Sequence, residues 1–311
     1  MSTNLSLIYT VSAVLLSAGL LLLGRVVWSL TAGYDAEHQL TEADNPAVGT
    51  SLFGFLGGLV IVLVALLATE GSPVDDPIGL AWDLGEMVIY GVLAIGLMRL
   101  SGVVNDKAIL YKFSNKKEIV DDRNVGTGAV LGGSYLASGL IIAGALGGRV
   151  DPELIAEQAT RLDIIAHEIG IALAFYAVGQ VALVIFGVLY QLMQPRDVHE
   201  AIAADYVKDG VKHGGNAAAG MAFGGNLLAL GLVMWGGARH DFSSWGDSFV
   251  TLGIATGVGL ALLPLWRIVV DKVMLARADL GKEIYEDRNV NAALLEVSTV
   301  LGLAAVLALL L

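Results

Sequence analysis

The sequence predicts an all-α integral membrane protein in which eight transmembrane helices form two parallel four-helix repeats. The first observation behind this fold class is composition. Hydrophobic residues make up 56% of the 311 positions and charged residues only 15%, and the mean hydropathy is +0.72. A water-soluble domain carries about 25% charged residues and could not bury this much apolar surface. The second observation is a set of eight long apolar stretches, and the third is an internal repeat.

Each apolar stretch is long enough to cross the ~30 Å hydrocarbon layer of a bilayer as a helix. The segments after the first, third, fifth and seventh stretches, helix ends included, hold 15 of the 18 Lys and Arg residues. This asymmetry predicts that those segments are cytoplasmic and that both termini are periplasmic. The first positive charge, Arg25, comes at the far end of the first stretch, which argues against a cleaved signal peptide. The predicted spans cover residues 5–30, 47–69, 79–100, 124–147, 164–192, 216–237, 249–270 and 289–311.

The internal repeat is visible in the segments between the spans. KEIVDDRNV at 117–125 returns as KEIYEDRNV at 282–290, an offset of 165 residues. Asp106-Lys107 matches Asp271-Lys272 at the same offset. Because each half contains an even number of spans, both halves enter the membrane in the same direction, and the repeats are parallel. The predicted division is a first repeat at 1–155 and a second at 156–311.

Every second span begins at an asparagine that is followed by small residues. An asparagine side chain accepts hydrogen bonds from the free backbone N–H groups at the start of a helix. The small residues after it allow helix backbones to approach closely, and a Gly-x-x-x-Gly spacing recurs at Gly128/Gly132 and Gly220/Gly224. We therefore predict four helical hairpins that pack through a glycine-rich central surface. The predicted capping residues are Asn45, Asn124, Asn216 and Asn289.

In these residues the sequence resembles the YjfL-like bacterial inner-membrane proteins, which carry a domain of unknown function numbered 350. The resemblance rests on Glu37-His38-Gln39-Leu40 leading to Asn45-Pro46-Ala47, and on the later capping asparagines with their small residues. It covers both halves, and since family members commonly have one four-helix unit, the chain resembles two fused copies. The resemblance implies a bacterial inner-membrane location and a link to envelope-stress systems. It implies no activity and no catalytic residues, and His38 stands where an aromatic residue is expected.

Glu296 is the strongest candidate for a functional site, because ionisable groups inside membrane spans are costly. It lies seven residues after Asn289, about 10 Å from the cytoplasmic end of its helix. The equivalent residue of the first repeat is Leu131, so the shared fold does not require an acid. Glu296 is predicted either to line a cavity as a protonatable carboxylate or cation ligand, or to form a structural pair with Arg267 or Arg99. A protonated Glu296 that hydrogen-bonds to a neighbour is a further structural alternative.

Asp83 and Glu86 lie one turn apart on the third predicted span, about 6–10 Å from its periplasmic end. One interpretation is an outer mouth that gathers cations, and the other is a solvated interfacial patch. The loop acids on the same side would make that mouth strongly negative. They are Glu70, Asp75 and Asp76.

Four other polar residues complete the candidates. His167-Glu168 begins the fifth span, but Ile171 stands where an HExxH zinc motif needs its second histidine. The pair is predicted to be interfacial, with His167 able to titrate near neutral pH. Gln180 and Asn226 lie nearer the bilayer centre and are predicted to form interhelical hydrogen bonds, with a place on a conduction path as the alternative.

Several classes of function are excluded or left without support. The net charge of −12 argues against a nucleic-acid partner. The absence of cysteine excludes disulfides and thiolate metal sites. No nucleophile elbow, phosphate-binding loop, dinucleotide fingerprint or metal-ligand spacing is present, so we predict no cofactor and no enzyme activity. The arginines that end spans on the cytoplasmic side, Arg25, Arg99 and Arg267, are predicted to extend toward lipid headgroups.

Two functions remain open. The first is a channel or transporter for a cation or proton along the axis of the repeats. The second is a non-transporting partner or scaffold in the envelope-stress response, which docks a cytoplasmic stress-response protein. The docking surface would be a helical stripe at 197–208 with Val198, Ile202 and Tyr206, although such a stripe could also lie on the bilayer. The predicted partners are therefore the lipid bilayer, further copies of the chain packed through glycine faces, and a stress-response protein.

Overall fold

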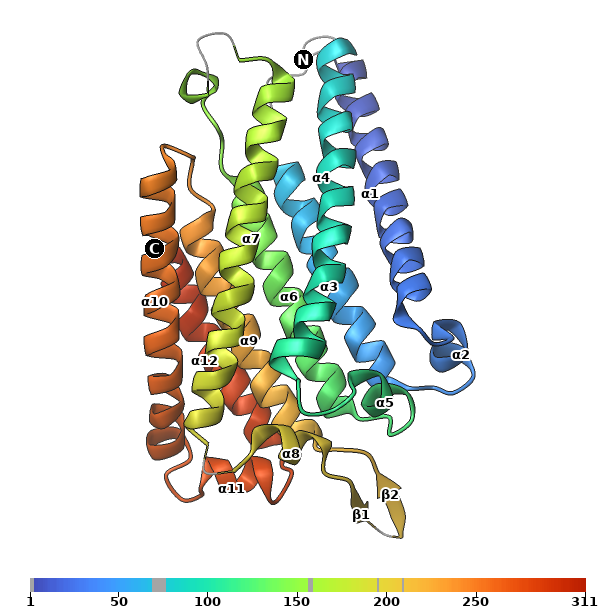
Figure 1. The fold of residues 1–311 in the computed structure, drawn as a ribbon, viewed down its shortest axis with the longest axis vertical. Coiled ribbons are helices and arrows are strands. Elements are labelled where there is room, and N and C mark those ends of the chain that lie inside the picture. The colour runs from blue at the N-terminus through green and yellow to red at the C-terminus, as the bar shows by residue number, and fades with distance from the viewer. Residues whose placement is uncertain (1–2, 69–76, 156–158, 195, 209) are drawn as a thin grey trace.

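The computed structural model describes residues 3–68, 77–155, 159–194, 196–208 and 210–311, and the loop acids Glu70, Asp75 and Asp76 lie outside this part. The described residues contain eight helices that are long and apolar enough to cross a membrane, one for each predicted span. They lie roughly side by side (Figure 1). The long helices are α1 (Thr3–Ala32), α3 (Pro46–Ala68), α4 (Pro77–Val104), α6 (Val125–Gly147), α7 (Arg161–Leu192), α9 (Ala217–Ala238), α10 (Trp245–Val269) and α12 (Val290–Leu310).

Short elements connect the long helices. Four one-turn or two-turn helices all lie at one end of the molecule, which we call the turn end, and the other is the terminus end (Figure 1). These short helices are α2 (Ala36–Thr41), α5 (Asn115–Val120), α8 (Val198–Ala203) and α11 (Leu280–Tyr285). Two π-helical turns follow α4 and α10, η1 (Asn105–Ile109) and η3 (Val270–Met274), and a 3-10 turn, η2 (Pro152–Leu154), precedes α7. Strands β1 (Tyr206–Lys208) and β2 (Val211–His213) pair antiparallel, with Tyr206 opposite His213.

Each pair of consecutive long helices forms one hairpin with the short helix between them. We number these hairpins as units 1 to 4: α1–α3, α4–α6, α7–α9 and α10–α12. Units 1 and 2 make the first repeat, and units 3 and 4 make the second. The matching π-helical turns η1 and η3 lie 165 residues apart, at the offset of the sequence repeat, so the two-repeat architecture predicted from the sequence is confirmed.

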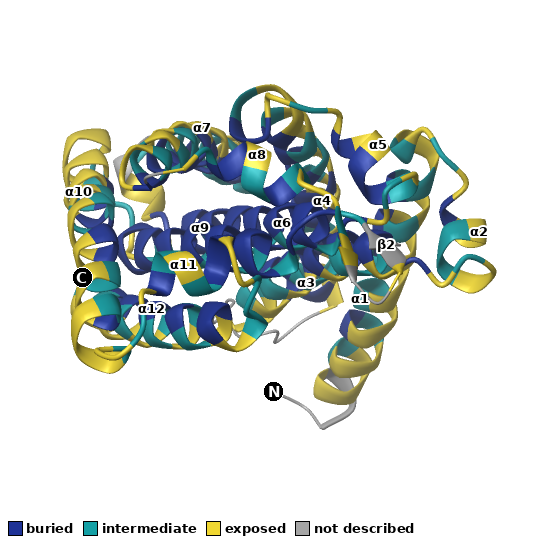
Figure 2. Cartoon of the chain, turned by 90° about the horizontal axis from the view of Figure 1, so that it is seen from below, coloured by how far each residue is buried: buried dark blue, intermediate teal, exposed yellow. Residues whose placement is uncertain are grey.

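The second helices of the units, α3, α6, α9 and α12, form one continuous row, in which each helix packs against the next. In Figure 2 the buried residues gather on α6 and α9 in the middle of this row. A Cβ atom on Gly133 would overlap the backbone of Gly224, so only glycine permits this approach. The predicted glycine-rich packing surface is thus confirmed. The first helices of units 2 to 4 lie over the grooves between neighbouring row helices. Helix α4 packs on α3 and α6, α7 packs on α6 and α9, and α10 packs on α9 and α12.

The four predicted capping asparagines occupy equivalent positions at the turn end. Each one accepts a hydrogen bond from a backbone N–H in the first turn of its own helix. The residue before each asparagine adopts a left-handed backbone conformation: Asp44 (φ 46°), Arg123 (φ 51°), Gly215 (φ 65°) and Arg288 (φ 54°). The sharp turn from each short helix into the row is therefore the same in all four units.

The asparagine side chains also link one unit to the next, a role that the sequence analysis missed. The Nδ2 atom of Asn45 donates to the Ile119 carbonyl of unit 2 at 2.8 Å. In the same way Asn124 donates to Ile202 of unit 3 at 2.9 Å, and Asn216 donates to Ile284 of unit 4 at 3.0 Å. Each asparagine thus caps its own helix and fixes the position of the following short helix.

The predicted docking stripe at 197–208 is wrong. Helix α8 ends at Ala203, and Tyr206 begins strand β1. Val198 and Ile202 are fully buried, with 1% and 0% exposure, because this short helix turns its apolar side toward the protein. Tyr206 instead lies under the Arg288 guanidinium, whose carbon is 4.1 Å from the ring centroid.

Candidate functional site

A cavity of about 340 Å³ opens at the terminus end of the first repeat. Helices α1, α3, α4 and α6 form its walls, and α7 with the loop before it closes one side. It collects three of the acids that the sequence analysis singled out. Its polar lining consists of Asp83, Glu86, Glu168, Tyr9, Tyr90 and Arg149. We call it the terminus-end cavity.

Arg161 and Tyr90 hold the three acids in place. The Thr160 cap fixes the first turn of α7, and from there the Arg161 Nη1 reaches Asp83 Oδ1 at 3.1 Å and Glu86 Oε1 at 3.3 Å. The Tyr90 hydroxyl donates to the Glu168 carboxylate. Asp83 and Glu86 therefore share one cation, whereas Glu168 is held by a neutral hydroxyl.

Sequence reasoning brought the acids forward but missed their partners. Arg161 lies 78 and 75 residues from its two acids, and Tyr90 lies 78 residues from Glu168. The one available signal was the rarity of cations on this side, because Arg161 is one of only three there and begins the span that also carries Glu168.

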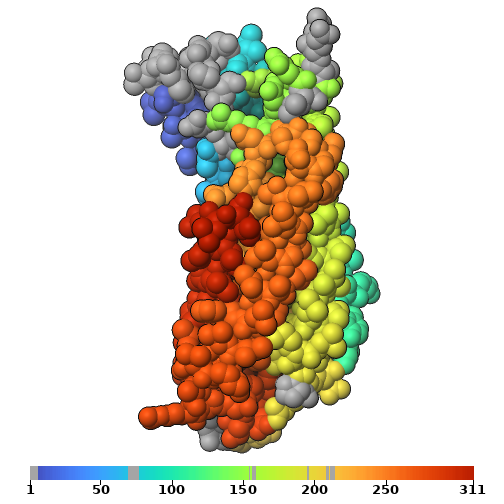
Figure 3. Space-filling model, turned by 90° about the vertical axis from the view of Figure 1, so that its left-hand side faces the viewer, coloured from blue at the N-terminus to red at the C-terminus, as the bar shows by residue number. Residues whose placement is uncertain are grey.

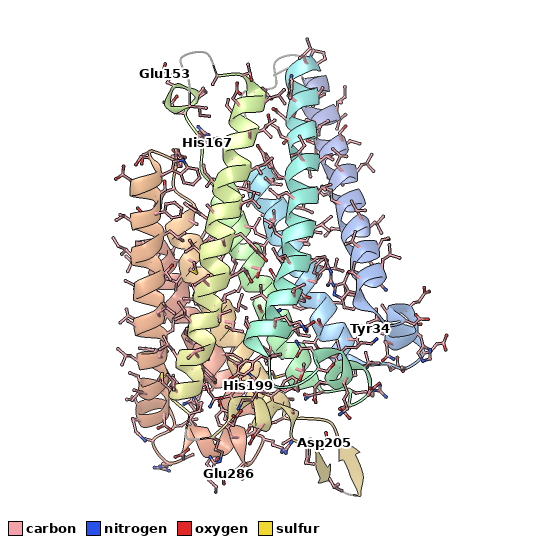
Figure 4. All side chains as sticks on the ribbon, in the orientation of Figure 1. Tyr34, Glu153, His167, His199, Asp205 and Glu286 are labelled. Atoms are coloured by element: carbon pink, nitrogen blue, oxygen red, sulfur yellow. The ribbon has the colours of Figure 1, made fainter. Side chains whose placement is uncertain are left out.

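A second cavity, of about 220 Å³, lies at the turn end between the same four helices, α1, α3, α4 and α6. We call it the turn-end cavity. Its polar lining consists of Thr31, Tyr34, Ser51, Arg99, Asp106, Asn115, Lys116 and Tyr135. Tyr34 lies just beyond α1 at this end (Figure 4), and burial raises the pKa of its hydroxyl, so Tyr34 stays neutral. The lining thus mixes cations, an acid and neutral donors.

Arg99 does not stand free in this cavity. Its Nη2 donates to the Thr31 carbonyl at 3.3 Å, and its guanidinium carbon lies 5.9 Å from the centroid of the Phe55 ring. Nearby, the Asn115 Nδ2 donates to Asp106 Oδ1 at 2.6 Å. These bonds fix the polar groups around the cavity.

A closed apolar layer separates the two cavities. Tyr90 and Arg99, which line the two cavities from α4, are nine residues apart, so the layer is about 13 Å thick. Large side chains pack directly on glycines in it: Leu59 on Gly24, Met98 on Gly58 and Leu20 on Gly91. The first repeat therefore has polar cavities at both ends and a seal in the middle.

Glu296 belongs to neither cavity. It is fully buried, and its Oε1 accepts from Asn226 Nδ2 at 2.9 Å and from Arg267 Nε at 3.1 Å. The Arg267 side chain is only 12% exposed, so the prediction that it extends toward lipid headgroups is wrong. The buried carboxylate one helix away draws the guanidinium inward, because an unpaired buried charge would be far more costly.

The repeat offset relates this ion pair to the turn-end cavity. Arg267 corresponds to Gly102, and Glu296 corresponds to Leu131, both 165 residues earlier. Gly102 and Leu131 line the turn-end cavity of the first repeat. The second repeat therefore places an ion pair where Gly102 and Leu131 border a cavity in the first repeat, beside the Tyr135 hydroxyl.

The two remaining candidates lie away from both cavities. The His167 ring, near the terminus end in Figure 4, packs edge-on against Phe242 at a centroid distance of 4.8 Å and lies 5.5 Å from Trp245. The Gln180 Nε2 donates to Ser138 Oγ at 3.0 Å and so joins α7 to α6. Among the residues that the structure describes, no three His, Asp or Glu side chains are grouped so that they could hold a metal ion.

Together the fold and the two cavities define a multi-pass α-helical membrane protein built from two parallel repeats. The chain belongs to the family described as Domain of Unknown Function (DUF350), whose family model matches residues 2–146 and residues 163–311. The two matched segments correspond to the two repeats, as the resemblance to a fused pair predicted. The comparison with curated proteins gave no match, and the comparison with solved structures gave none either.

Proposed function

We propose that this protein transports protons or small monovalent cations across the bacterial inner membrane, and that the path runs through the first repeat. The observation that carries this proposal is the pair of polar cavities at opposite ends of the same four helices. A solute path that is closed at one point has this form. By the positive-inside rule we infer that the turn end is cytoplasmic and that both termini are periplasmic.

Glu168 is the group that we expect to bind the cation or proton. Asp83 and Glu86 share the single positive charge of Arg161, at 3.1 and 3.3 Å. Among the described residues, the hydrogen-bond partner of Glu168 is the neutral Tyr90 hydroxyl. Its negative charge is therefore the one that a cation would neutralise, and ionisable groups inside membrane spans commonly mark such paths.

Helix α1 is the element that we expect to move. It lies at the edge of the molecule, with only 17% of its most apolar stretch buried. Two of its contacts across the closed layer involve glycine, Gly24 against Leu59 and Leu20 against Gly91. Glycine has no side chain that could interlock with its partner in these two contacts. Helix α1 could therefore slide by a small amount and open the layer with little loss of packing.

Flux measurements in proteoliposomes test the proposal. We expect Glu168→Gln, which keeps the shape of the side chain and a partner for Tyr90, to reduce proton or cation flux at least tenfold. Glu153→Gln is the matched control, because Glu153 is an exposed acid at the same end (Figure 4). Full flux in Glu168→Gln would remove Glu168 from the path. A wild-type protein without flux under several ionic gradients and voltages would overturn transport itself.

A disulfide between α1 and α4 tests the role of α1. Because the sequence contains no cysteine, the introduced thiols can pair only with each other. The Leu20 Cγ lies 3.2 Å from the position of a Cβ on Gly91, which suits a disulfide between Leu20→Cys and Gly91→Cys. We expect the oxidised double variant to lose flux and to regain it on reduction. The flux of each single variant should be the same with and without the oxidant. Equal flux before and after reduction of a fully cross-linked sample would show that α1 does not move.

The alternative function, a docking partner in the envelope-stress response, is favoured by one other observation. The β1–β2 hairpin projects from the turn end (Figure 1), and Val207 on it is 71% exposed. Val207→Asp should then abolish co-purification of a cytoplasmic partner while leaving flux unchanged. Retention of the partner by this variant would count against docking on the hairpin.

A further inference from the structure

The row of second helices is open at both ends. In α6 and α9, which have row neighbours on both sides, 78% of the most apolar stretch is buried. The figure falls to 44% for α3 and 28% for α12, which each have a neighbour on one side only. Figure 3 shows the red end of the chain, in α12, lying uncovered on one side of the molecule. The row thus stops with two unused faces, one on α3 and one on α12.

We propose that a second copy of this chain continues the row, with the free face of its α3 packed against the free face of α12. The association is independent of the transport activity proposed above. Its partner is identified by the packing rule inside the molecule, by an unused hydrogen-bond pair and by the position of α1.

The packing rule is the same at every step of the row. The residue nine positions after the capping asparagine of one unit faces the residue eight positions after the capping asparagine of the next unit. In the same way, the residue thirteen positions after the first asparagine faces the residue fifteen positions after the second. Gly54 faces Gly132, Gly133 faces Gly224, and Gly225 faces Val297; likewise Gly58 faces Gly139, and Ala137 faces Gly231. Because each unit repeats the rule, the residues that a fifth unit would contact can be read from the sequence.

On α12 those residues are Ser298 and Gly302, and on α3 they are Phe53 and Val60. Ser298 is exposed, and nothing lies within 4 Å of a Cβ on Gly302. Phe53 and Val60 are 70% and 42% exposed. Small residues on α12 would therefore receive large residues from α3. The spacing of Ser298 and Gly302 is the small-x-x-x-small pattern that lets membrane helices approach closely.

An unused hydrogen-bond pair lies at the turn end of the same two faces. Asn45, Asn124 and Asn216 are almost fully buried, whereas Asn289 is half-buried. The Asn289 Nδ2 donates to its own Glu283 at 2.8 Å, and none of the described residues accepts its other N–H. The equivalent of the acceptors Ile119, Ile202 and Ile284 in unit 1 is Leu40, to whose carbonyl no described residue donates. The Leu40 carbonyl of a second copy would supply the missing acceptor.

Helix α1 gives the third argument. The first helices of units 2 to 4 each pack on two row helices, whereas the described part of α1 packs mainly on one, α3. In a continued row it would lie over the groove between α3 and the neighbour's α12, and its long exposed side would be covered. The contact joins two different faces, so it is heterologous, and copies would close into a ring or extend as a row.

Cysteine cross-linking in native membranes tests the proposal. In a mixture of a Phe53→Cys copy and a Ser298→Cys copy, we expect oxidation to give dimers that contain one of each. The double variant should give a ladder of dimers, trimers and larger species. Val181→Cys is the matched control, since Val181 is 59% exposed on α7, away from both faces, and should not cross-link to Ser298→Cys. Ser298→Cys dimers formed with themselves, or no cross-linked species, would overturn the head-to-tail contact.

A packing variant gives an independent readout. Gly302→Trp should lower the cross-linking yield of the Phe53→Cys and Ser298→Cys pair at least tenfold, because tryptophan would hold the two helices apart. Gly96→Trp is its control, as nothing lies within 4 Å of a Cβ at that exposed glycine of α4. An unchanged yield in Gly302→Trp would contradict the proposed register even if copies associate in another way.

Discussion

The turn-end regions of the two repeats have the same backbone but different side chains, which leave a cavity in one repeat and form an ion pair in the other. Both follow a π-helical turn, and both include a row helix that begins at a capping asparagine. In the first repeat Gly102 and Leu131 leave a cavity of about 220 Å³. In the second, Arg267 and Glu296 meet at 3.1 Å and occupy the equivalent place. The exchange involves more than this pair, because Asn226, which also donates to Glu296, corresponds to Ile61 in the first repeat.

The terminus ends differ in the same sense. In the first repeat Trp82 is followed by Asp83 and Glu86, which line the terminus-end cavity. In the second, the residues 165 positions later are Ser248 and Thr251, and they line a smaller cavity of about 130 Å³. The second repeat thus has hydroxyl side chains where the first has Asp83 and Glu86 at this end, and an ion pair at the other end. We therefore propose a division of labour, in which the first repeat carries the transport path and the second supports it.

The largest effect should come from breaking the ion pair. Arg267→Gly leaves Glu296 buried without its cation, and losing one partner of a buried pair costs about 3–5 kcal/mol of folding free energy. The measurement is equilibrium unfolding of the purified protein in denaturant. The variant should unfold at a clearly lower denaturant concentration than the wild type.

The double variant Arg267→Gly/Glu296→Leu shows whether the comparison between the repeats is valid. It installs the two residues that the first repeat uses, so no unpaired charge remains, and most of the lost stability should return. If the double variant is as unstable as Arg267→Gly alone, the two sites are not equivalent, and the division of labour loses its basis.

The reverse exchange tests the first repeat. Gly102→Arg/Leu131→Glu should place the ion pair of the second repeat in the turn-end cavity, where the Tyr135 hydroxyl, 2.6 Å from a Cβ on Gly102, has to turn aside. We expect flux to fall at least tenfold while the unfolding midpoint changes little. A variant that is folded and still fully active would show that the path avoids this cavity.

Sequence reasoning succeeded for features that are set by residues close together in the chain or by a fixed repeat distance. The spans follow from runs of apolar residues, and the repeats follow from the 165-residue offset. The caps follow from an asparagine before small residues. It failed for contacts between distant residues, such as Arg161 with Asp83 and Tyr90 with Glu168, because nothing local indicates which helices become neighbours. It also left two places open for Arg267, the lipid headgroups and a pair with Glu296, since a helix-end arginine looks the same whether it faces lipid or a buried acid.

The smallest expected effect on stability comes from a difference between the short helices of units 1 and 2. The Glu118 carboxylate accepts from Asn124 Nδ2 at 2.7 Å, where unit 1 uses the neutral Gln39 for Asn45 at the same 2.7 Å. Burial raises the pKa of Glu118, and Asp122 and Asp205 add to the shift, against the Asn124 hydrogen bond and Lys117, which favour the charged form. The folded state therefore holds a proton that the unfolded chain releases at lower pH. Because of this, stability should be highest below the ordinary Glu pKa and fall as pH rises through the raised value.

Glu118→Gln removes this titration and copies the residue of unit 1. At neutral pH we expect the variant to be slightly more stable than the wild type, and the difference should vanish below the ordinary pKa of glutamate, where both side chains are neutral. Unfolding midpoints measured across that pH range give the difference directly, with other titrating groups common to both proteins. A variant that is less stable than the wild type at neutral pH would mean that Glu118 is held by its charge, and a difference of the same size at every pH would mean that its titration does not contribute to stability.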